Sequence, residues 1–150
     1  MKSFMFFVCF ILCCSQLAAL QWANSVGNNM EWEEAFSFCQ NLGEGGHGDW
    51  RMPNIDELRS TIINNSYTQM GGACKVSQQN KCLQRSCLQE NLCQVSITCD
   101  GCKFSKFGDT GWFWSSSART DEPRRKWGVN FNNATISSNG KGKAAVRCVR

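Results

Sequence analysis

Histidine, proline and long apolar runs are scarce in this chain of 150 residues. It contains 1 His and 2 Pro, and no apolar run approaches the roughly 20 residues that a membrane-spanning helix requires. Charged residues make up 19% and hydrophobic residues 42%, which is too hydrophobic for a disordered chain. The composition therefore excludes a membrane bundle and disorder, and the length predicts one domain with its own core.

The first 19 residues have the pattern of a secretory signal peptide. Met1 and Lys2 give a short positive start, residues 4–14 are uninterruptedly apolar, and Ala19 offers a small residue for cleavage. A lipid anchor on Cys14 is the less favoured alternative, because a small residue does not precede it. We therefore expect a signal peptide over residues 1–19, followed by a domain that is secreted, periplasmic or exposed at the cell surface.

Removal of the signal peptide leaves eight cysteines in residues 20–150. An exported chain with an even number of cysteines is typical of a disulfide framework. Six of them lie in residues 74–102, which contain few large apolar residues and could hardly fold by burial alone. We call residues 74–102 the Cys-rich insert and expect cross-links within it, in a pairing that the sequence leaves open. The eight are Cys39, Cys74, Cys82, Cys87, Cys93, Cys99, Cys102 and Cys148.

Two helices are predicted in the first half of the domain. Over residues 31–42 apolar side chains recur every three or four positions and acidic residues occupy the first turn, while Gly43 follows the last one. A second helix is predicted after Asn54, which has the spacing of a capping box with Glu57.

The remaining segments have the period of β-strands. A short strand over residues 20–22 is predicted to precede turns over 24–29, and further strands are expected at 112–117, 126–131 and 144–150. This order indicates an α+β domain in which two helices pack on a small antiparallel sheet. The first strand is free to pair with the last, because the chain ends of a compact domain often meet.

Five ordered motifs cover nearly all of the chain after the signal peptide. They are Trp22; Trp32-Glu33-Glu34-Ala35 with Cys39 and Leu42; Gly48-Asp49-Trp50-Arg51-Met52-Pro53 with Glu57-Leu58; Trp114-Ser115-Ser116-Ser117; and Val146-Arg147-Cys148-Val149-Arg150. Together they resemble the Lcl C-terminal domain family, first catalogued as a domain of unknown function. The resemblance implies a C-type-lectin-like fold, related at the fold level to formylglycine-generating enzymes, in exported bacterial proteins.

The resemblance also bears on one disulfide and on the ligand. In a lectin-like fold a cysteine on the first helix typically bonds one in the last strand, and Cys39 and Cys148 hold those positions. The collagen-like adhesin that names the family is a surface protein whose terminal domain binds sulfated glycosaminoglycans. Function varies within the family, so an adhesin-like activity comes to this chain by association only. The cysteine pair of the formylglycine-generating enzymes has no matching motif here.

Two patterns near the helices suggest catalysis, and each has a simpler interpretation. Asp49 and Arg51 could form an acid and base pair, but we expect them to satisfy turn backbone, with Trp50 in the core. His47 could join the serines of residues 115–117 in a triad, yet no Gly-x-Ser-x-Gly elbow is present. We therefore expect no enzymatic activity and no cofactor.

Two further patterns suggest metal binding. Cys99 and Cys102 have the spacing of half a zinc site or a redox pair, but export favours a plain disulfide. Glu122-Pro123-Arg124 is similar to the Glu-Pro-Asn triplet by which many animal C-type lectins hold calcium and a sugar, but Arg124 cannot supply an oxygen ligand. No metal site is therefore expected, and ligand binding should not depend on calcium.

Charge is divided unevenly along the chain. Residues 20–100 hold 5 basic and 9 acidic side chains, a net charge of −4, whereas residues 101–150 hold 10 and 3, a net charge of +7. If the turns that carry the basic residues lie at one end of the sheet, they form a rim able to hold sulfate or phosphate groups. The predicted rim consists of Arg119, Arg124, Arg125, Lys126, Lys141 and Lys143.

These observations favour an exported, non-catalytic binding module that recognises polyanionic, sulfated glycans through its basic loops, in the manner of an adhesin. The alternative is a structural or protein-binding domain of the cell envelope. Nucleic acid is a poor partner for an exported protein, and the sequence leaves a homo-oligomer open.

Overall fold

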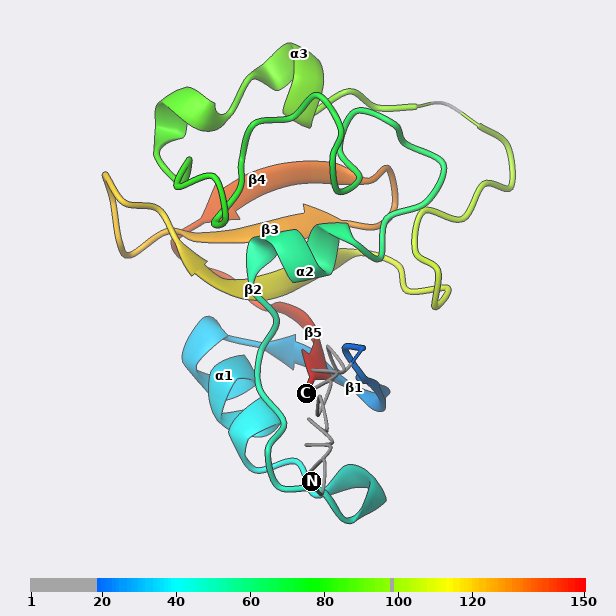
Figure 1. The fold of residues 1–150 in the computed structure, drawn as a ribbon, viewed down its shortest axis with the longest axis vertical. Helices are drawn as coiled ribbons and strands as arrows, with labels where there is room; N and C mark the ends of the chain where they lie inside the picture. Colours follow the sequence, from blue (N-terminus) through cyan, green and yellow to red (C-terminus); the bar gives the residue numbers. More distant parts are fainter. Residues whose placement is uncertain (1–18, 98) are drawn as a thin grey trace, which may run out of the picture.

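The computed structural model describes residues 19–97 and 99–150 (Figure 1). The predicted signal peptide, apart from Ala19, lies outside the described residues, as do Cys9, Cys13 and Cys14. The elements in chain order are β1 (Trp22–Met30), α1 (Trp32–Gln40), α2 (Ile55–Arg59), α3 (Glu90–Cys93), β2 (Trp112–Ala118), β3 (Lys126–Asn130), β4 (Thr135–Asn139) and β5 (Ala144–Val149), with 3-10 turns at Glu44–Gly46 and Arg85–Cys87.

The strands form one mixed sheet in the order β1-β5-β2-β3-β4. β1 pairs with β5 in antiparallel orientation, which confirms that the two ends of the domain meet. β2 and β5 run parallel to each other, whereas the other pairs are antiparallel. The α+β class is confirmed, but the expectation of an antiparallel sheet was wrong. The connection after β4 takes the chain back across the sheet to β5, which lies beside β2, instead of forming a hairpin.

Strand β1 is longer than expected. The segment over residues 24–29, predicted as turns, lies within the strand and pairs irregularly with β5, through two register shifts. Gly27 allows close packing there, because a Cβ would lie 3.0 Å from side-chain atoms of Phe38 and Val146, which would have to shift to admit it. Asn29 adopts a φ of 56° near the end of the strand. The Asn and Gly residues that predicted turns therefore permit bulges and close packing instead.

Both predicted helices are present, and β4 was not foreseen. Glu31 caps α1, with its backbone N–H donating to the Glu34 carboxylate at 2.9 Å. Asn54 and Glu57 form the predicted capping box of α2. Strand β4, Thr135–Asn139, has only one large apolar residue, so its sequence gave little sign of a strand.

The sheet has a core on each face. In β2, Phe113 faces α2 and the insert, whereas its neighbour Trp114 faces α1, because successive side chains of a strand point to opposite sides. The first core also contains Val129 and Ile136, and the second contains Cys148. Helix α1 and the insert therefore lie on different sides of the sheet.

All eight predicted cysteines form disulfides. Cys39–Cys148 links α1 to β5, as the family resemblance implied. The other six pair within the insert, as Cys74–Cys93, Cys82–Cys87 and Cys99–Cys102. The structure thus supplies the pairing that the sequence left open.

Candidate functional site

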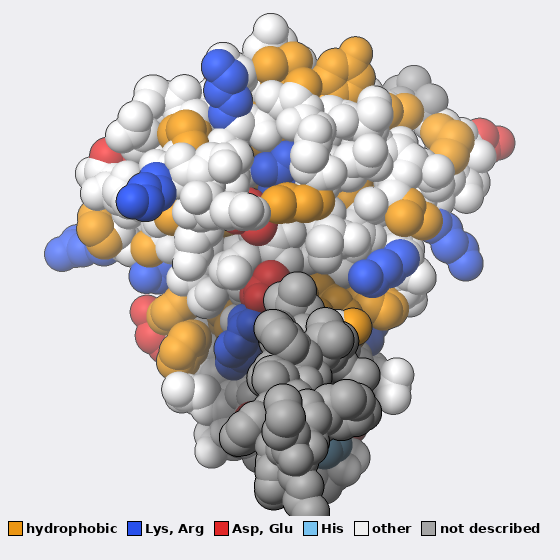
Figure 2. Space-filling view, viewed as in Figure 1, with side chains coloured by type: hydrophobic (Ala, Val, Ile, Leu, Met, Phe, Trp, Pro, Cys, Tyr) orange, Lys and Arg blue, Asp and Glu red, His pale blue; other side chains and the backbone are white. Residues whose placement is uncertain are grey.

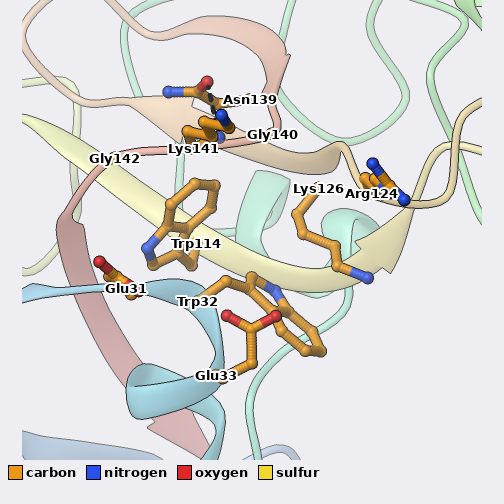
Figure 3. Close-up of a pocket in the computed structure, with 10 residues that line it drawn as sticks. All are labelled: Glu31, Trp32, Glu33, Trp114, Arg124, Lys126, Asn139, Gly140, Lys141 and Gly142. Atoms are coloured by element: carbon orange, nitrogen blue, oxygen red, sulfur yellow. Dashed lines mark hydrogen bonds between the residues drawn. The ribbon is translucent and has the colours of Figure 1, made fainter.

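A pocket of about 320 Å³ lies where α1 approaches two loops at one edge of the sheet (Figure 3). That volume is at the lower end of the range for small-ligand sites. One wall comes from the start of α1, and the other from the β2–β3 loop, the adjoining start of β3 and the β4–β5 turn. The lining residues are Glu31, Trp32, Glu33, Trp114, Arg124, Lys126, Asn139, Gly140, Lys141 and Gly142.

Two tryptophans fix the shape of the pocket. Trp32 Nε1–H donates to the backbone oxygen of Ser115 at 2.8 Å, which ties α1 to β2. Trp114 Nε1–H donates to the backbone oxygen of Met30 at 3.0 Å, and this indole is only 2% exposed. Because each ring is held by a hydrogen bond and by packing, the base of the pocket is preorganised.

Three of the six predicted basic residues line this pocket. Arg124 is exposed in the β2–β3 loop, and Lys141 is exposed in the β4–β5 turn, where its backbone N–H donates to Asn139. Lys126 Nζ donates to the backbone oxygen of Pro123 at 3.0 Å and lies 4.3 Å from the centre of the Trp32 ring. The two basic turns therefore do lie at the same end of the sheet.

The guanidinium groups of Arg119 and Arg125 are held within the protein. Arg119 is 5% exposed and forms ion pairs with Asp121 and Glu122. Arg125 donates to the backbone oxygen of Ser138 at 2.7 Å, which joins the β2–β3 loop to β4. These two side chains position the loop that carries Arg124.

Lys143 is exposed after the β4–β5 turn but is not among the residues that line the pocket. The structure thus brings together three of the six predicted basic side chains around one pocket and places the other three outside it.

Asp121 anchors the same loop through its carboxylate. It accepts hydrogen bonds from the Arg119 side chain at 2.6 Å and from the backbone N–H of Arg85 at 3.1 Å. Chiefly through Arg119, these contacts lower the pKa of Asp121 from 3.8 to about 2. The β2–β3 loop is therefore bound to the insert across the edge of the sheet.

One face of the molecule shows no single cluster of Lys and Arg side chains. On the face shown in Figure 2, Lys and Arg side chains lie apart from one another, with hydrophobic and neutral polar groups between them. Of the residues that line the pocket, Arg124, Lys126 and Lys141 come from three successive segments of the edge. Three basic side chains therefore converge on this pocket.

The side chains before α2 that suggested an acid and base pair are held in packing and ion pairs. Trp50 is buried. Asp49 forms an ion pair with Arg150, and Arg51 forms one with Glu57. The Arg150 guanidinium also lowers the pKa of Asp49. These side chains thus hold the chain segment before α2 against the C-terminal strand.

Two of the three serine hydroxyls suggested for a triad, those of Ser115 and Ser117, are used in internal hydrogen bonds. Ser115 donates to the backbone oxygen of Trp127, and Ser117 donates to Gln78 while accepting from the backbone of Ile55. Among residues 19–97 and 99–150, no cluster of three His, Cys, Asp or Glu side chains has the geometry to hold a metal ion.

Sequence reasoning did not assign Trp32, Trp114, Glu31 or Glu33 to the pocket. Their position depends on how α1 packs on β2, which joins segments more than 80 residues apart. The one sequence feature that could have indicated these residues is Glu31-Trp32-Glu33, which places an aromatic side chain between two charged ones at the beginning of a helix.

Comparison with known proteins identifies the family. The model of the Lcl C-terminal domain matches residues 15–150, and no curated protein matches the chain. Within the described part of the chain, no helix is long and apolar enough to cross a membrane, and the four disulfides fit an extracellular location. The match spans the described domain, and the chain therefore belongs to the Lcl C-terminal domain family.

Proposed function

We propose that this domain is an exported, non-catalytic binding module, adhesin-like in its action, that recognises sulfated glycans through the pocket between α1 and the two basic loops. We also propose that its fold is C-type-lectin-like. The pairing of β1 with β5 and the disulfide between Cys39 and Cys148 support that assignment.

The observation that carries the binding proposal is the convergence of Arg124 and Lys141 on one preorganised pocket. Both side chains are exposed, and within the described residues neither forms a salt bridge. A guanidinium donates two parallel hydrogen bonds to one anion, and the ammonium of Lys141 adds a second positive charge nearby. A sulfate group entering between them meets two cations that form no salt bridge with a described carboxylate.

The proposed binding needs no metal ion. Arg124 stands where a coordinating amide would be required, and an arginine has no oxygen to offer Ca²⁺. A chelator is therefore expected to leave glycan binding unchanged.

The experiment is chromatography of the oxidised domain, residues 20–150, on immobilised heparin. The pocket variant is Arg124→Ala with Lys141→Ala. The control variant, Lys75→Ala with Arg85→Ala, removes the same charge from two exposed side chains of the insert. Circular dichroism verifies that both variants fold, which is expected because exposed charges contribute little to stability.

The domain is expected to be retained above physiological salt, and the pocket variant to elute at a distinctly lower salt concentration than the control. At about 0.15 M salt the Debye length is about 8 Å, so only direct contacts retain the protein. If the domain washes through, or if both variants elute together, the glycan proposal fails and the domain is better explained as a structural or protein-binding part of the cell envelope.

A further inference from the structure

The pocket has walls of opposite charge. Glu31 and Glu33 line it on the α1 side, whereas Arg124 and Lys141 line it on the loop side, with Trp114 between them (Figure 3). All four charged side chains are exposed, and within residues 19–97 and 99–150 none of them forms a salt bridge.

The feature that sets this pocket apart is that charges of both signs line one volume without forming a salt bridge among the described residues. Arg51 pairs with Glu57 and Arg147 with Asp109, whereas within the described residues the exposed Arg85 forms no salt bridge. At the pocket, carboxylates and cations line one small volume but stay apart, because α1 and the loops hold them on opposite sides. The field across the pocket therefore runs from a positive side to a negative one.

Trp32 does not offer an open ring face for stacking a sugar. The ring of Phe36 is stacked on it with centroids 5.2 Å apart, and the Lys126 ammonium lies over it. Selection within this pocket must therefore rest mainly on charge and hydrogen bonding.

We infer that the pocket selects a sulfated amino sugar whose amine is free and protonated, with the sulfate at Arg124 and Lys141 and the ammonium group at Glu31 and Glu33. This inference rests on the proposed function and adds the class of sugar unit. A ligand with negative groups alone meets repulsion from the two carboxylates, whereas a zwitterionic unit satisfies both walls. An N-acetylated unit brings an uncharged amide to the acidic wall and loses that attraction.

The test compares de-N-sulfated heparin with the same polymer after re-N-acetylation, in mildly acidic buffer where the amines are protonated. The two polymers share their O-sulfates and differ at the nitrogen. The free-amine polymer has the lower net negative charge, so attraction to a generally basic surface would favour the acetylated one. Affinities are measured by calorimetry, with intact heparin as the reference for sulfate-dependent binding.

The domain is expected to bind the free-amine polymer about threefold to tenfold more tightly, the range for two exposed charge contacts. Glu31→Gln with Glu33→Gln should abolish that preference while leaving binding to intact heparin intact or stronger. Glu90→Gln, an exposed acidic residue in the first turn of α3, should retain the preference.

The outcomes separate this inference from the proposed function. If the domain binds intact heparin but does not prefer the free-amine polymer, or if the double Gln variant keeps the preference, the amino-sugar inference is wrong and the glycan proposal stands. If intact heparin does not bind, the proposed function itself fails.

Discussion

The two sides of the sheet are stabilised by different means. On the α1 side, Ala35 and Cys39 pack against β5, and the core consists of aromatic and aliphatic side chains with one disulfide. On the insert side, Val76 and Phe104 supply part of the core, but three disulfides hold the chain. The insert itself contributes few large apolar side chains, so disulfides and polar contacts add to a core that α2 and strands β2 to β4 largely supply. The short helix α1 thus supports the pocket on one face of the sheet. On the other face, α2 and the mostly irregular Cys-rich insert cover the strands.

Arg59 is the main polar contact on the insert side. At 2% exposure, its guanidinium donates to the backbone oxygens of four residues that lead into the insert or belong to it. Burial lowers the pKa of this side chain, and Asp56 partly offsets the effect. The four acceptors are Thr68, Gln69, Cys74 and Val76.

Replacement of Arg59 should have the largest effect on stability. Arg59→Met leaves buried carbonyl groups without a donor and removes the cation near Asp56, so we expect a loss of about 3 to 5 kcal/mol in the free energy of unfolding. Urea denaturation measures it. Arg59→Lys keeps the charge but not the planar fork, and should lose most of the same stability. A loss below about 1 kcal/mol for Arg59→Met would show that the insert does not depend on this contact.

Removal of the Cys39–Cys148 disulfide should have the second largest effect on stability. Cys39→Ser with Cys148→Ser opens a link between residues 109 apart in the sequence, and the expected loss is roughly 2 to 5 kcal/mol. Removal of Cys99–Cys102, which spans 3 residues, should cost less than about 2 kcal/mol. Denaturation of both oxidised variants gives the comparison, and peptide mapping checks the pairing. A free thiol at Cys39, or its pairing with an insert cysteine, would contradict the fold.

Local patterns predicted the elements whose determinants lie within them. Helix α2 was found from Asn54 and Glu57, which satisfy its first turn themselves. Strand β1 was underestimated because its residues 24–29 are strand only through pairing with β5, about 120 positions away. The basic half of the pocket was visible as a cluster in the sequence, whereas Glu31 and Trp32 could be assigned to it only from the packing of α1 on β2.

Low pH should have a smaller effect on stability, through the Arg119–Asp121 ion pair. The pKa of Asp121 is lowered in the folded protein, so its contribution is present above the unfolded value near 3.8 and is lost as the pH falls through about 2. We expect the Arg119–Asp121 contact to persist down to about pH 2, as followed by the NMR signals of both side chains. Asp121→Asn removes this titration and serves as the control. Titration of Asp121 at its ordinary value would mean that the loop is not held as described.

We propose that the pocket on the α1 side, not the general charge of the protein, binds glycan. The most direct measurement is an NMR titration of the labelled oxidised domain with a sulfated heparin oligosaccharide. The largest changes are expected at the indole N–H signals of Trp32 and Trp114 and at the amides of Gly140 and Gly142, with little change at Lys75 and other exposed basic residues of the insert. Changes spread evenly over all basic residues, or greatest in the insert, would contradict the claim.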